Sequence, residues 1–171
     1  MDDKGIATVT GHISLRRFTL DPAADYQTML ETLGRRYGMP YVFEIEPEEL
    51  GRNMCGAYDD LTQVICINAE LTDVQKRCTL VHELFHWLHG HAGCAGVQGM
   101  KDENRVRRET ALFLIDPVDC AIAEQEHDGD LFGMSSELNV TVQVLEDYRQ
   151  TLDGLKLRAP IKLKSTLMQW G

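Results

Sequence analysis

The chain has 171 residues, of which 43% are hydrophobic and 26% charged, and this is the size and composition of one soluble globular domain. Its formal net charge of −10 argues against tight non-specific binding to nucleic acid, because that affinity comes from Lys and Arg contacts to phosphates. No apolar stretch approaches the roughly 18–20 residues that a membrane span requires, and residues 1–18 lack the apolar core of a secretory signal.

The N-terminal part is predicted to combine a helix with strands. Tyr26, Met29 and Leu33 are spaced as on one face of a helix, and the residues that follow this helix alternate as in a strand. Asp59 and Asp60 favour a turn, so the strands on either side of them are expected to form a hairpin. The predicted order is a loosely structured segment 1–20, a helix 24–37, and strands 41–45, 55–58 and 63–68.

A long buried helix is predicted next. Thr72 is a suitable N-cap, Gln75 three residues later can complete a capping box, and Gly90 marks the end of the helix. The residues between are apolar on more than one side, which is typical of a helix surrounded by the core. We therefore expect a helix over residues 72–89.

The remainder of the chain is predicted to be mainly helical. The expected helices cover residues 101–115, 118–126, 135–138 and 142–152. We interpret residues 1–171 as one domain, with a core at about 21–116, a helical C-terminal subdomain at 117–155 and, at 156–171, a tail that could include a strand. The five cysteines include no CxxC pair, so we expect reduced thiols in a cytoplasmic protein.

Four of the six histidines lie within residues 82–91, and this segment begins with the motif HExxH. On a helix, His82 and His86 lie on nearly the same face about 6 Å apart along the axis, so both rings can bind one zinc ion. Glu83 is rotated by about 100° and is placed to act as the general base that takes a proton from water and passes it to the leaving amine. The alternative is a purely structural role, although unpaired histidines and a glutamate are costly in a buried helix.

A catalytic zinc site needs a third protein ligand, for which the sequence offers several candidates. A metzincin would carry a histidine where Ala92 stands, His89 lies too far along the helix axis, and His91 follows the predicted helix end. In the next predicted helix, Glu103 lies on the face that carries the apolar residues, whereas Glu109 is rotated by about 120° and is expected to face solvent. The spacing therefore favours Glu103 over Glu109 and His91.

These features together resemble the ImmA/IrrE family of small bacterial and phage metallopeptidases. The resemblance rests on three blocks in order, GAYDDLTQVICIN at residues 56–68, LTDVQKRCTLVHELFHWLHGH at 71–91 and ENRVRRETALFLID at 103–116. It covers roughly residues 25–150. HExxH alone is common to many zinc peptidases, whereas the three blocks in this order are more specific.

The resemblance implies a minimal zincin-like α+β fold, with a small antiparallel sheet packed on the HExxH helix and a helical C-terminal part. It implies one zinc ion bound by His82, His86 and Glu103. It also implies cytoplasmic cleavage of a helix-turn-helix repressor, which derepresses a prophage, a mobile element or a stress regulon. In one respect the sequence departs from related sites, which carry a carboxylate or amide four residues after the ligand Glu, where this chain has Arg107.

Zincin-like folds bind an extended substrate along an edge strand beside the active-site helix, and residues 63–68 are predicted to form that strand. These residues are Gln63, Val64, Ile65, Cys66, Ile67 and Asn68. Candidate donors to the transition state are Arg107, His127, Tyr58 and Tyr148.

A function of another class stays open, in which the chain binds and sequesters a repressor without cleaving it and the metal serves only the structure. Residues 134–152 have the spacing of a helix-turn-helix, but Arg149 is their only cation. Direct binding to DNA is therefore not expected.

Overall fold

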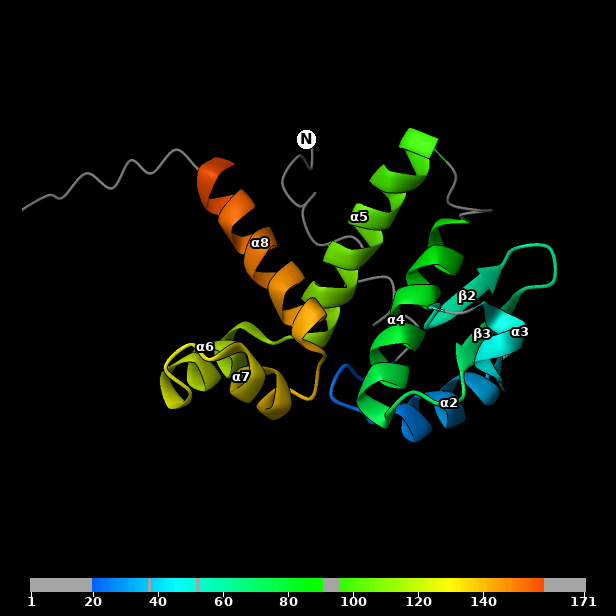
Figure 1. The fold of residues 1–171 in the computed structure, drawn as a ribbon, viewed down its shortest axis with the longest axis horizontal. Coiled ribbons are helices and arrows are strands. Elements are labelled where there is room, and N and C mark those ends of the chain that lie inside the picture. Colours follow the sequence, from blue (N-terminus) through cyan, green and yellow to red (C-terminus); the bar gives the residue numbers. More distant parts are fainter. Residues whose placement is uncertain (1–19, 37, 52, 91–95, 159–171) are drawn as a thin grey trace, which may run out of the picture.

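The computed structural model describes residues 20–36, 38–51, 53–90 and 96–158 and has the predicted α+β fold (Figure 1). In chain order its elements are α2 (Tyr26–Gly34), β1 (Tyr41–Ile45), α3 (Pro47–Leu50), β2 (Gly56–Asp59), β3 (Val64–Asn68), α4 (Asp73–His89), α5 (Gly96–Leu114), α6 (Pro117–Glu126), α7 (Leu131–Glu137) and α8 (Val142–Arg158). The predicted N-terminal segment up to residue 19 and the predicted tail from residue 159 lie outside the described residues.

Helix α4 is surrounded by other elements, as its apolar residues predicted. The capping box is present, with Gln75 N donating to Thr72 Oγ1 and Thr72 N donating to Gln75 Oε1. Gly90 ends the helix in the left-handed conformation, with φ of 60°. The helix packs against α2, β2, β3 and α5. Its fully buried apolar residues are Leu80, Val81, Leu84 and Phe85.

The sheet has the strand order β1-β3-β2, which places β3 in the centre. Strands β2 and β3 form the predicted antiparallel hairpin, with Ala57 opposite Cys66. Strand β1, however, runs parallel to β3, so the sheet is mixed and the prediction of an antiparallel sheet is wrong. The chain passes through α3 and β2 between these two strands, which is enough length to bring β3 back in the direction of β1.

The central position of β3 also corrects the predicted substrate strand. Residues 63–68 were expected to form an edge strand, but β1 and β2 occupy both edges of β3. Its main-chain groups are therefore used within the sheet and cannot pair with a peptide. The edge strand that packs against α4 is β2.

Helix α5 lies between α4 and α8, whereas α6 and α7 pack against each other beside α8 (Figure 1). Several bounds differ from the prediction. Helix α5 begins at Gly96, within a segment expected to be a loop, and α8 continues to Arg158. Helix α7 begins at Leu131 because the Asp130 side chain accepts a hydrogen bond from Gly133 N and caps it. None of the helices in the described part of the chain combines the length and hydropathy that a bilayer-spanning segment requires.

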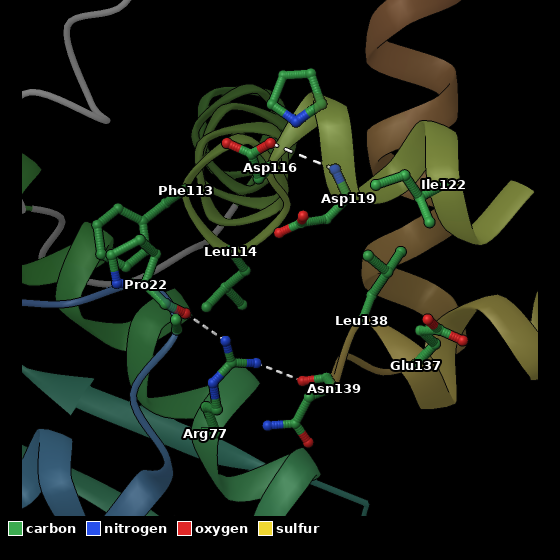
Figure 2. A pocket seen from close by; sticks show the side chains of 12 residues that line it. Pro22, Arg77, Phe113, Leu114, Asp116, Asp119, Ile122, Glu137, Leu138 and Asn139 are labelled. Carbon is green, nitrogen blue, oxygen red and sulfur yellow. Dashed lines mark hydrogen bonds between the residues drawn. The ribbon is translucent and has the colours of Figure 1, made fainter.

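Arg77 of α4 is buried and connects three segments of the chain. Its Nε donates to the carbonyl oxygen of Ala24 at 2.8 Å, and its two Nη groups donate to the carbonyl oxygens of Pro22 and Asn139. Figure 2 shows the guanidinium between the segment that precedes α2 and the turn that joins α7 to α8. A pocket of about 660 Å³ lies next to this junction.

Candidate metal centre

The structure brings His82, His86 and Glu103 together. The two histidines are one turn apart on α4, and Glu103 reaches them from α5. His86 Nε2 is 3.2 Å from His82 Nε2 and 3.2 Å from Glu103 Oε2, and His82 Nε2 is 3.3 Å from Glu103 Oε1. One ligand atom from each residue therefore lies within 4.8 Å of the others. Helix α5 thus supplies a carboxylate from the position that the spacing favoured.

This donor set fits a divalent metal ion. Two imidazole nitrogens and a carboxylate form the protein ligands of one class of catalytic zinc site. With zinc bonds of about 2.0–2.1 Å, tetrahedral ligands are about 3.3 Å apart. The two imidazole nitrogens here are 3.2 Å apart, and each has a different Glu103 oxygen at 3.2–3.3 Å. Hydrogen bonds from the rings of His82 and His86 hold the pKa of the Glu103 carboxyl below its ordinary range, so this carboxyl is ionised, as a ligand must be.

Glu83 is buried between α4 and strand β2, with 7% of the residue exposed. A side-chain carbon added at Gly56 would lie 3.3 Å from Glu83 Cγ, and the backbone N–H of Tyr58 donates a hydrogen bond to the Glu83 carboxyl. Burial raises the pKa of Glu83, which the charges of His82 and His86 oppose only in part. A carboxyl with a raised pKa is suited to accepting and returning a proton near neutral pH.

A second contact between α4 and α5, formed by His89 and Glu109, was not predicted. His89 Nε2 lies 2.5 Å from Glu109 Oε2, and only 11% of the Glu109 side chain is exposed. The expectation that Glu109 faces solvent is wrong, because α4 covers it. A signal was available in the sequence, since His89 follows His82 by seven residues and therefore shares its face of α4. The remaining candidate ligand, His91, lies outside the described residues.

Arg107, one turn after Glu103 on α5, is held by a carboxylate of α8. Its Nε is 3.0 Å from Asp147 Oδ2, and its Nη2 is 2.6 Å from Asp147 Oδ1. The Asp147 hydrogen bonds raise the pKa of Arg107, and the charge of Glu103 contributes in the same direction. Where related sites carry a carboxylate or amide, this chain therefore carries a cation, Arg107, which is paired with Asp147 of α8.

The other candidate transition-state donors are engaged elsewhere. Tyr148 is buried, and His127 Nε2 lies 2.7 Å from a carboxylate oxygen of Glu137. The Tyr58 hydroxyl donates to Asp60 at 2.8 Å, and burial together with Asp60 raises the pKa of Tyr58 to about 12. Arg107 is engaged as well, through Asp147, although its charge also interacts with that of Glu103.

The pocket of Figure 2 is separate from this cluster. Its walls come from the segment before α2, Arg77, the junction of α5 with α6, and the turn after α7. His82, His86 and Glu103 do not line it. The candidate chemistry therefore belongs to the interface of α4, α5 and β2.

The comparison with known families covers this same interface. Residues 48–147 match the IrrE N-terminal-like domain of the M78 peptidases, and this range contains His82, Glu83, His86 and Glu103. No curated protein and no solved structure matched the chain. The matched range is more than half of the chain and confirms the predicted resemblance. The chain therefore belongs to the M78 family of metallopeptidases, through an IrrE N-terminal-like domain.

Proposed function

We propose that the chain is a zinc-dependent endopeptidase that acts in the cytoplasm, with His82, His86 and Glu103 as ligands of one zinc ion and Glu83 as the general base. The observation that carries this proposal is the convergence of two imidazole nitrogens and a carboxylate beside a buried glutamate of the same helix. When bound, zinc would supply Lewis-acid activation of the scissile carbonyl and of water.

Glu83 moves the proton in this reaction. Its carboxylate takes a proton from the attacking water and delivers it to the nitrogen of the leaving amine. Burial of the Glu83 carboxyl favours the protonated form that must exist between the two transfers.

The substrate chain is proposed to lie along β2. This strand packs against α4, begins at Gly56 next to Glu83, and has β3 on one edge only. No other described strand pairs with its second edge. An extended peptide that adds to this edge would form main-chain hydrogen bonds and would pass close to Glu83.

The protein substrate is proposed to be a helix-turn-helix repressor, as the sequence resemblance implies. DNA-binding domains are basic, and the chain has no Lys or Arg between Arg108 and Arg149. The exposed Asp and Glu of this stretch are Asp116, Asp119, Glu124, Glu126, Asp128, Asp130 and Glu137. Helices α6 and α7 also expose Val118, Ile122 and Phe132. An acidic surface with exposed apolar groups suits a basic protein partner.

The partner assignment predicts salt-sensitive binding to a repressor of this kind. We expect affinity measured by calorimetry to fall as salt rises, and Phe132→Ala, which removes a side chain with 76% exposure, to weaken binding about tenfold. Tyr41, with 71% exposure, lies on β1 at the edge of the sheet opposite β2, so Tyr41→Ala is the matched control and should leave affinity unchanged. Salt-independent binding, or equal losses in both variants, would count against this surface.

Replacing the general base tests the enzyme assignment. Glu83→Gln keeps the size of the side chain but cannot accept the proton, so we expect cleavage of the repressor to fall at least about 100-fold. The zinc content of the variant should stay at the wild-type value, because Glu83 is not a ligand. Mass spectrometry of the repressor after incubation measures cleavage, and atomic absorption measures zinc.

The same variant separates cleavage from sequestration. If Glu83→Gln still derepresses a reporter gene in cells while the repressor stays intact and zinc stays bound, the enzyme assignment is wrong and the chain is a binding protein. His82→Ala serves as the companion variant and should lose zinc and cleavage together.

A further inference from the structure

The pair formed by His89 and Glu109 lies between the two helices that carry the metal-binding residues. The side chains of His89 and Glu109 are 15% and 11% exposed, and their nearest atoms are 2.5 Å apart. Arg105 adds a contact from Nε to Glu109 Oε1 at 3.1 Å. Because the pair is largely removed from water, the hydrogen bond between the imidazole and the carboxylate is stronger than the same contact would be at an exposed site.

Apolar packing supports the pair at the same interface. The ring of His89 stacks with that of Phe85, with centroids 6.3 Å apart and an interplanar angle of 21°. Phe85 in turn packs edge-on against Phe113 of α5, with centroids 6.2 Å apart. The His89 ring thus contacts Phe85, which itself packs on α5, and forms a hydrogen bond with Glu109 of α5.

His89 and Glu109 lie on the same two helices as the proposed metal ligands, a short distance further along each helix. His89 is three residues after His86 on α4, and Glu109 is six residues after Glu103 on α5. Glu103 and Glu109 therefore both connect α5 to α4 through polar contacts. Together with the packing of Phe85 on Phe113, two such points restrain the rotation of α5 about its axis more than a single polar contact would. Glu103 needs this support because 39% of its side chain is exposed.

We propose that His89 and Glu109 are positioning residues, which hold α5 against α4 so that the Glu103 carboxylate meets His82 and His86. This inference rests on the proposed zinc site. It adds two residues that do not bind the metal but hold in place the helix that carries Glu103. Ligand atoms must be held to within about 0.5 Å of their binding geometry, so a small rotation of α5 is enough to lower the affinity for zinc.

The test uses His89→Ala and Glu109→Ala in the full chain. Alanine preserves helix propensity, so the variants remove the contact without a helix-breaking residue. We expect zinc affinity, measured by competition with a chromophoric chelator, to fall about tenfold or more. The visible spectrum of the cobalt-substituted protein should change as well, because it reports ligand geometry. Glu109→Gln keeps a hydrogen-bond acceptor and should recover part of the affinity.

The chain offers a matched control in His127 and Glu137, an imidazole–carboxylate pair outside α4 and α5 with a distance of 2.7 Å. His127→Ala and Glu137→Ala should leave zinc affinity and the cobalt spectrum unchanged. Circular dichroism checks that each variant is folded, and His89→Leu or Glu109→Leu, which also remove the polar contact, replaces the corresponding alanine variant if that one is not.

The outcomes distinguish this inference from the proposed function. Wild-type zinc binding with unchanged affinity and spectrum in the His89 and Glu109 variants would overturn the inference alone. Equal losses in the His127 and Glu137 controls would also overturn it, because they would indicate a general loss of stability. A wild-type chain that binds no zinc would overturn the proposed function and this inference together.

Discussion

At the scale of single residues, the candidate centre shows how burial divides the acidic side chains by role. Glu83 and Glu103 both lie close to His82 and His86, yet their pKa values move in opposite directions. Burial dominates at Glu83 and favours the neutral acid, whereas hydrogen bonds from two histidines dominate at Glu103 and favour the carboxylate. One group is thus suited to proton transfer and the other to binding a cation.

Replacing the third proposed ligand tests the division of roles at this scale. Glu103→Gln removes the charge and one anionic oxygen, so we expect zinc affinity to fall at least about 100-fold. The control is Glu124→Gln on α6, whose side chain is 63% exposed and lies outside the candidate metal-binding cluster. Competition with a chelator measures the zinc affinity of both variants. Full zinc occupancy of Glu103→Gln at stoichiometric metal would show that another residue is the ligand.

The residues of the centre were predictable to different degrees. His82, Glu83 and His86 follow from a local motif, and Glu103 follows from helical spacing on the next helix. The exposure of Glu109 was predicted wrongly because it depends on how α4 packs against α5. The residue spacing within α5 alone carries no information on that packing. The same holds for Arg107, whose partner Asp147 is 40 residues away.

At the scale of elements, local signals set the helix ends and non-local pairing set the sheet. The ends of helix α4 were predicted within one residue, because Thr72, Gln75 and Gly90 cap the helix through contacts with residues adjacent in sequence. The order of the strands could not be read in this way, since the parallel pairing of β1 with β3 joins segments that α3 and β2 separate. The hairpin of β2 and β3 was predictable because its turn is local.

The contact of β2 with α4 predicts an effect of side-chain volume at Gly56. A Cβ there would lie 2.5 Å from Thr79 Cγ2 and 3.1 Å from Cys66 O, and the branched Thr79 has little rotamer freedom in a helix. We expect Gly56→Ala to lower the free energy of unfolding by about 1–3 kcal/mol, as overpacking does.

The matched control for this substitution is Gly34→Ala at the end of α2, where an added Cβ meets nothing within 4 Å. It should raise the free energy of unfolding by about 0.4–1 kcal/mol, because it reduces the freedom of the unfolded chain. Urea denaturation measures both variants. A Gly56→Ala protein as stable as Gly34→Ala would show that β2 does not approach α4 so closely.

At the scale of the whole molecule, Arg77 connects the segment before α2, helix α4 and the turn between α7 and α8. Its guanidinium is buried and donates to main-chain carbonyls of Pro22, Ala24 and Asn139. Each carbonyl would lose its partner if the side chain were apolar, and a buried unpaired carbonyl costs free energy. The sequence did not reveal this role, because an arginine on a helix usually faces solvent.

This junction predicts a large effect of Arg77→Met, which keeps much of the side-chain volume and removes the donors. We expect the free energy of unfolding to fall by roughly 3 kcal/mol or more. Arg35→Met is the control, because Arg35 is 79% exposed and pairs only with the neighbouring turn through Glu31, so it should change stability by less than about 0.5 kcal/mol. Equal denaturation midpoints for the two variants would contradict the assigned role.

The proposed ligands come from two different helices, and this arrangement has a thermodynamic consequence. An ion that joins α4 to α5 binds the native chain and not the unfolded one, so its binding free energy is added to the stability of the fold. At a free zinc concentration about 100 times the dissociation constant, the gain is about 2.7 kcal/mol. In a cell poor in zinc the chain would therefore be not only inactive but also more exposed to degradation, and metal supply would govern its abundance.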